Sequence, residues 1–166
     1  CRKPVIASID GWCIGGGLDL IAACDIRIAT KAAQFSLREV KVAIVADLGS
    51  LQRLPAIIGD GATRELAFTG KNIDAERALS LGLISDILDD RAALDEATMK
   101  MAREIRDNPP LVVQGIKSIM NHNTQKTVDD GMEYVALWNT AFLQSMDLTE
   151  AFTAFREKRE PKFKGQ

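Results

Sequence analysis

A run of three glycines at residues 15–17, followed by Leu-Asp-Leu, constrains the fold more than any other feature of the sequence. Glycine loses more backbone freedom on folding than any other residue, so such a run is costly to order. An apolar stretch at 5–9 precedes it and a charge-poor stretch at 18–24 follows, which predicts a strand, a glycine turn and a buried helix. Free N–H groups at such a helix start suit a phosphate or an oxyanion. Close packing of strand on helix explains the glycines equally well.

Size and composition exclude several classes of protein. The 166 residues suffice for one domain with a substantial core, and the net charge of −2 argues against a general nucleic-acid binder. The apolar runs are too short to cross a membrane, and the chain does not start with a secretory signal. The odd number of cysteines (Cys1, Cys13 and Cys24) is typical of reduced thiols in an intracellular protein. Because a strand pattern follows Cys1 almost directly, we expect the chain to begin inside a domain.

The pattern of elements predicts an α/β fold divided into regions 1–90 and 91–166. The first region alternates strands and helices, and the second is helical throughout. Strands are expected at 5–9, 26–29, 35–37 and 84–88, and helices at 18–24, from near 48, at 61–69 and at 75–81. The later helices are expected from 91 to the prolines at 109–110, from there through Ile119, at 128–146 and at 148–158.

Common catalytic motifs are missing from this sequence. The glycines do not fit the dinucleotide pattern G-x-G-x-x-G, because Leu20 stands where the third glycine belongs. The single histidine, His122, lies between two asparagines and is predicted to be a solvent-facing loop residue. We therefore expect neither a metal site nor a histidine-based triad.

Three carboxylates remain as candidates for proton transfer. Asp19 follows the glycines, Glu39 follows a short strand, and Asp47 precedes a predicted helix. Each has an ordinary structural explanation. Asp19 suits the positive end of a helix, Glu39 suits the surface, and Asp47 suits the N-cap of the next helix.

The combination of motifs resembles the enoyl-CoA hydratase/isomerase family, which has the crotonase fold. The resemblance runs along the whole chain in order and corresponds to the C-terminal part of the family fold. It implies a ClpP/crotonase-like spiral of strand–helix units, followed by a helical trimerisation region. The residues that carry it are 3–7, Gly11, 15–20, 24–29, 35–39, 48–55, Ala62, 68–70, 75–78, 82–84, Lys117 and 155–159.

This resemblance also implies a site and a reaction. In the family, a CoA thioester carbonyl meets two backbone N–H groups, one of which falls here on Gly16, between Gly15 and Gly17. The two glutamates of family hydratases fall on Asp19 and Glu39. Asp47 stands where hydratases usually have glycine, and the three acids together look like the Δ3,5-Δ2,4-dienoyl-CoA isomerases. By that resemblance Asp47 removes the C2 proton, Glu39 protonates C6, and Asp19 orients them.

The resemblance further implies a homotrimer or homohexamer that binds an acyl-CoA thioester without a separate cofactor. Lys158 matches a position that approaches the CoA of a neighbouring subunit, although a solvated lysine explains it equally well. Neither a nucleic acid nor a membrane is expected as a partner. The expected location is mitochondrial or peroxisomal in a eukaryote and cytoplasmic in a bacterium. Two alternatives stay open: an enoyl-CoA hydratase, and an inactive fragment that serves as an oligomerisation module.

Overall fold

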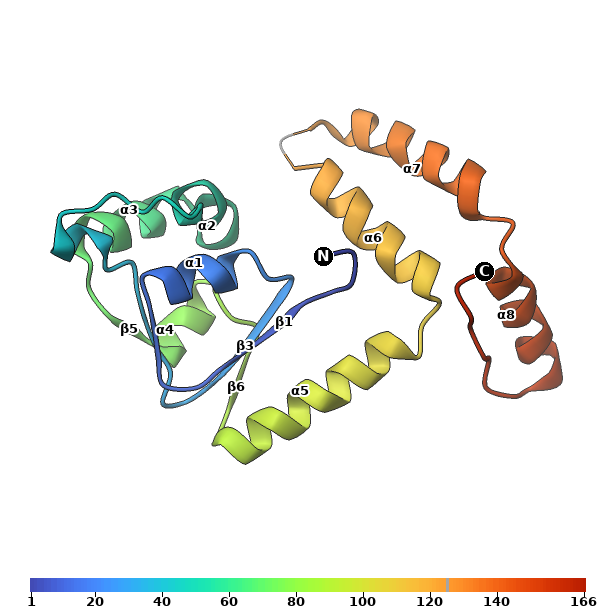
Figure 1. The fold of residues 1–166 in the computed structure, drawn as a ribbon, viewed down its shortest axis with the longest axis horizontal. Helices are drawn as coiled ribbons and strands as arrows, with labels where there is room; N and C mark the ends of the chain where they lie inside the picture. The colour runs from blue at the N-terminus through green and yellow to red at the C-terminus, as the bar shows by residue number, and fades with distance from the viewer. Residues whose placement is uncertain (125) are drawn as a thin grey trace. The chain divides into compact units, whose positions relative to one another are not determined.

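The computed structural model describes residues 1–124 and 126–166, which form two units (Figure 1). One unit is Val5–Lys100, and the other combines Cys1–Pro4 with Met101–Gln166. The predicted division between residues 90 and 91 stays a prediction.

Strands and short helices alternate in the unit Val5–Lys100, as the sequence predicts. Its strands are β1 (Ile6–Ile9), β2 (Trp12–Ile14), β3 (Ile26–Thr30), β4 (Gln34–Ser36), β5 (Ile73–Asp74) and β6 (Asp86–Leu88). Its helices are α1 (Gly16–Ala22), the 3₁₀ helix η1 (Glu39–Val42), α2 (Ser50–Ile58), α3 (Asp60–Thr69) and α4 (Ala75–Ser80). The sequence prediction missed β2, β5 and η1, which are too short to produce a clear periodicity.

The strands pair in two small sheets. In the first, β1, β3 and β6 are all parallel, with Ile6 opposite Ile26 and Ile28 opposite Asp86. In the second, β2 and β4 are parallel and β5 is antiparallel to β4. Parallel strands need crossover connections, and α1 supplies the one between β1 and β3.

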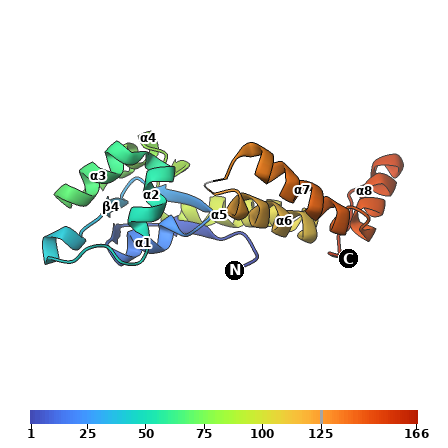
Figure 2. The same ribbon diagram turned by 90° about the horizontal axis from the view of Figure 1, so that it is seen from above.

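Apolar side chains from both sheets and from α1, α2 and α3 form the core of this unit. α1 packs on α2, and α2 packs on α3 (Figures 1 and 2). The most deeply buried side chains include Leu18, Phe35, Leu54, Leu66 and Leu83. This core fixes the glycine turn before α1 relative to the start of α2.

The second unit is helical. α5 (Arg91–Arg106) crosses the boundary between the units and leads to α6 (Pro110–His122), α7 (Val128–Phe142) and α8 (Met146–Glu157). α7 ends earlier and α8 begins earlier than expected, because the Ser145 hydroxyl accepts the Leu148 N–H and caps α8. His122 is exposed as expected but ends α6 instead of lying in a loop, and its ring stacks on Tyr134.

The residues after α8 fold back onto that helix. The buried Asp147 carboxylate accepts the N–H groups of Lys164 and Gly165 at 2.7 and 2.8 Å. Glu150 accepts two hydrogen bonds from the Arg159 guanidinium. These bonds are the main reason why the pKa of Glu150 is lowered to about 2. The C-terminal segment is therefore an ordered part of this unit.

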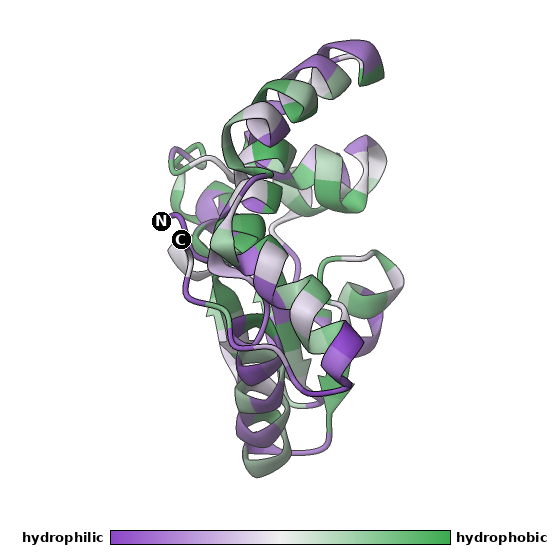
Figure 3. Ribbon diagram, turned by 90° about the vertical axis from the view of Figure 1, so that its right-hand side faces the viewer, coloured by the Kyte–Doolittle hydropathy of each residue, from purple (hydrophilic) through white to green (hydrophobic). Residues whose placement is uncertain are grey.

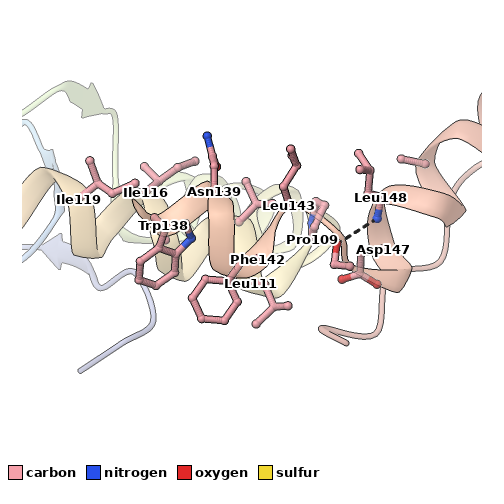
Figure 4. A pocket seen from close by; sticks show the side chains of 14 residues that line it. Pro109, Leu111, Ile116, Ile119, Trp138, Asn139, Phe142, Leu143, Asp147 and Leu148 are labelled. Carbon is pink, nitrogen blue, oxygen red and sulfur yellow. Dashed lines mark hydrogen bonds between the residues drawn. The ribbon is translucent and has the colours of Figure 1, made fainter. Parts of the chain in front are cut away.

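An apolar pocket of about 210 Å³ lies among α6, α7 and α8 (Figure 4). Trp138, Phe142 and Ile116 contribute to its wall. Exposed apolar side chains also occur outside the pocket, and hydrophobic and hydrophilic residues stand side by side on these helices (Figure 3). Among the described residues, no helix has the length and apolar character needed to span a bilayer.

Because α6 and α7 approach closely at Gly115, we expect the protein's stability to depend on the absence of a side chain there. A Cβ atom there would lie 2.6 Å from Trp138 Nε1, and a rigid indole cannot yield as a flexible chain end does. We expect Gly115→Ala to destabilise the protein by about 1–3 kcal/mol. In the control Gly61→Ala, on α3, the added methyl group meets open space. That variant should be more stable by about 0.5–1 kcal/mol. Urea unfolding followed by circular dichroism measures both, and equal effects of the two variants would contradict this packing.

Candidate active site

The glycine turn is built on a backbone conformation that favours glycine. Gly15 has φ 56°, its N–H donates to the Ser36 carbonyl at 2.9 Å, and its carbonyl accepts the Asp19 N–H at 3.0 Å. These bonds tie the start of α1 to the end of β4. The first N–H groups of a helix lack acceptors within it, so Gly16 and Gly17 offer donors at this end. Gly16 is exposed, so a ligand can approach the chain at this position.

Glu39 lies directly against this turn. Its Oε1 is 3.1 Å from the position that a Cβ atom on Gly15 would take, so a larger residue at 15 would displace the carboxylate. Its Oε2 is buried and has no hydrogen-bond partner within residues 1–124 and 126–166. Leaving a buried polar atom unpaired costs free energy, so such an atom needs an explanation, such as a catalytic role or a bound water or ligand that pairs with it. Glu39 is therefore not the ordinary surface charge that the sequence also allowed.

Asp19 lies on α1 and is buried, with 4% of its surface exposed. Its Oδ1 accepts the Ser50 N–H at 3.0 Å and also a hydrogen bond from the Ser50 hydroxyl. Gly49, the N-cap residue of α2, has no side chain with which to cap the helix. Asp19 thus satisfies the first N–H of α2 from another helix.

Asp47 is exposed in the loop between η1 and α2. The alternative that it caps the next helix is wrong, because Gly49 occupies the N-cap position. Leu48 follows it, and Leu48 Cδ1 lies 4.0 Å from the position of a Cβ atom on Gly16. The loop that carries Asp47 therefore reaches the glycine turn.

Apolar side chains line the segment between Glu39 and Asp47. Val40, Val42, Ile44 and Val45 are exposed, with Val45 the most open at 75%. Exposed apolar residues in such number mark a surface that a ligand or another chain covers. They lie between two acids, on the loop that reaches the helix start.

Lys158, the remaining candidate, belongs to the other unit. It is exposed and ends α8 in the left-handed conformation with φ 55°, unusual for a residue other than glycine. Its N–H donates to the Phe155 carbonyl at 3.3 Å.

Sequence reasoning missed Ser50 and Leu48 as parts of the site. A serine directly after glycine at a helix start was the available signal for Ser50, but it normally indicates a local cap. The partner of Ser50 is 31 residues away, so only the fold reveals this contact.

The profile of the enoyl-CoA hydratase/isomerase family matches residues 1–166, the full chain. The chain belongs to this family. The α/β crotonase fold expected from the sequence is confirmed, since an enoyl-CoA hydratase from Bacillus anthracis superimposes with a TM-score of 0.95 at 35% identity. That match covers 99% of this chain and 64% of the hydratase. The enoyl-CoA hydratase of Mycobacterium tuberculosis H37Rv matches with a TM-score of 0.94, also at 35% identity.

Several similar relatives carry names that state an activity. The mitochondrial Δ(3,5)-Δ(2,4)-dienoyl-CoA isomerase of Dictyostelium discoideum is 51% identical over 99% of this chain and 56% of its own length. The peroxisomal enzyme of the same name from Arabidopsis thaliana is 48% identical over 98% of this chain and 59% of its own length. A hydratase, the (E)-benzylidenesuccinyl-CoA hydratase of Thauera aromatica, is 39% identical. The chain spans about half the length of the curated relatives it matches.

The cysteine beneath the turn gives a test of this packing. Cys13 Sγ lies 3.6 Å from the position of a Cβ atom on Gly17, and burial raises the pKa of the Cys13 thiol to about 11. A raised pKa favours the neutral thiol, so we expect iodoacetamide at pH 8 to spare Cys13 and to modify exposed Cys1. Labelling of folded Cys13 should rise as the pH approaches 11. Peptide mass spectrometry measures each site, and equally fast labelling of both at pH 8 would refute this placement.

Proposed function

We propose that the protein containing this chain is a Δ3,5-Δ2,4-dienoyl-CoA isomerase. The observation that carries the proposal is that the Asp19 carboxylate accepts hydrogen bonds from Ser50. A hydratase of this family uses two carboxylates to activate water, at the positions of Asp19 and Glu39. Here Asp19 is the shorter acid and binds the start of α2. The higher identity to isomerases than to hydratases supports the same conclusion.

In the proposed reaction, the thioester carbonyl accepts the Gly16 N–H, and Gly15 and Gly17 allow it to approach the backbone. The Asp47 carboxylate removes a proton from C2 of a 3,5-dienoyl-CoA. The charge spreads over a dienolate, whose oxygen a backbone donor stabilises. The Glu39 carboxyl group then protonates C6, which leaves double bonds at C2 and C4. One proton leaves and one arrives, so the composition of the substrate is unchanged, and exchange with solvent restores both acids.

Glu39 is suited to proton delivery because its unpaired Oε2 is shielded from water beside the turn. Asp47 is suited to proton removal because its loop also carries Leu48, which reaches Gly16. The apolar residues between the two acids suit the acyl chain. Asp19 orients the arrangement.

The proposal extends to the assembly and its location. We propose a homotrimer or homohexamer in which Lys158 approaches the CoA of a neighbouring subunit, with no cofactor beyond the CoA of the substrate. An intracellular location is proposed, mitochondrial or peroxisomal in a eukaryote and cytoplasmic in a bacterium. The dienoyl-CoA isomerases of Dictyostelium discoideum and Arabidopsis thaliana are named as mitochondrial and peroxisomal, respectively.

Hydration of a 2-enoyl-CoA is the second candidate function, favoured by the relatives that are named hydratases. Measuring the 3-hydroxyacyl-CoA product separates it from isomerisation. A non-catalytic oligomerisation module is the third, favoured by exposed apolar residues on α6, α7 and α8. Self-association in sedimentation without any CoA binding would support that role.

The test of the main proposal is the variant Asp47→Asn in the longest native form that contains residues 1–166. We expect isomerisation of a 3,5-dienoyl-CoA to fall by about 10²–10⁴-fold, because a general base is lost. Thioester affinity should change little. Chromatography of the product gives the rate and calorimetry gives the affinity. The control Asp129→Asn removes an exposed acid on α7 and should retain full activity. Full activity in Asp47→Asn would remove Asp47 from the mechanism.

A further inference from the structure

The contact between Asp19 and Ser50 connects two helices at the candidate active site. Both side chains are buried, at 4% and 1% exposure. The N–H and the hydroxyl of Ser50 donate to the same oxygen, Oδ1 of Asp19. Hydrogen bonds to a carboxylate are stronger than those between neutral groups. This pair therefore holds the first residue of α2 against α1.

The loop before Ser50 has few other attachments: the buried side chain of Ala46 and two hydrogen bonds. Ile44 N–H donates to the Glu39 carbonyl at 3.1 Å at one end, and the Arg53 side chain donates to the Leu48 carbonyl at the other. Within the described chain, neither the backbone nor the side chain of Asp47 makes a hydrogen bond. Asp47 lies between buried Ala46 and Ser50, three residues further on, so its place relative to the glycine turn depends on both anchors.

We propose that Ser50 is a positioning residue for the reaction. By binding Asp19 it fixes the start of α2, and with it Asp47 and Leu48, against the turn that contains Gly16. Asp19 then serves as a hydrogen-bond acceptor and carries no proton to or from the substrate. This inference rests on the proposed isomerase function and adds a residue that the family resemblance did not assign.

The principal test compares Ser50→Ala with Ser50→Thr in the longest native form that contains this chain. Ser50→Ala removes the hydroxyl bond and keeps the backbone bond. We expect kcat for a 3,5-dienoyl-CoA to fall about 10- to 100-fold, as for a slightly misplaced catalytic group, while KM changes by less than about threefold. Ser50→Thr keeps a hydroxyl group and should restore most of kcat.

A matched control is available at Thr30 on β3. Thr30 is buried, and its hydroxyl donates to the Asp10 carboxylate at 2.6 Å. This is the same type of hydroxyl–carboxylate hydrogen bond that Ser50 makes with Asp19. Thr30→Val should lower the thermal midpoint about as much as Ser50→Ala does but leave kcat unchanged. If Ser50→Ala and Thr30→Val change kcat equally, Ser50 has only a structural role and the proposal fails.

Asp19→Asn provides a second test that does not depend on the fit of threonine. The asparagine carbonyl oxygen can accept both bonds from Ser50, so kcat should stay within about tenfold of wild type. A loss as large as that of Asp47→Asn would make Asp19 a proton carrier and overturn the inference. If the wild-type protein does not isomerise a 3,5-dienoyl-CoA, the proposed function itself fails and the positioning role fails with it.

Discussion

The site depends on the turn at Gly15, where one backbone conformation brings three elements together. The positive φ angle lets the Gly15 N–H reach the end of β4 while its carbonyl opens α1. The missing side chain leaves room for the Glu39 carboxylate. A residue with a Cβ atom would be strained there and would push Glu39 away. Ordering the glycines costs free energy, but only a glycine at residue 15 allows the Glu39 carboxylate to lie beside the N–H groups that begin α1.

The sequence predicted the fold class because its strongest signals are local. The apolar strand at the start and the amphipathic C-terminal helices follow from the hydrophobic pattern, and the turn follows from three consecutive glycines. β2 and η1 were missed because elements of a few residues leave no periodic pattern. The boundary between α7 and α8 was misplaced because it depends on the Ser145 cap, a single hydrogen bond. The helix boundary that the sequence did not predict is thus set by a single contact.

The candidate site was predictable in its residue types but not in its connections. Glycines followed by acids indicated an oxyanion site with proton transfer, and the family resemblance assigned the roles. Three acids that look alike in sequence differ in the structure. Asp19 is buried and bonded, Glu39 has an unpaired buried oxygen, and Asp47 is exposed. This difference arises from contacts between segments distant in sequence, Asp19 with Ser50 and Glu39 with Gly15, which no local pattern encodes.

The proposed isomerisation uses two different carboxyl groups, one to remove a proton at C2 and one to deliver a proton at C6. The most direct measurement is turnover of a 3,5-dienoyl-CoA in deuterated water, with the product analysed by NMR. In the proposed reaction both acids exchange protons with solvent between turnovers, so the 2,4-dienoyl-CoA product should carry deuterium at C6. A 3-hydroxyacyl product, or a 2,4-dienoyl product without deuterium at C6, would contradict it.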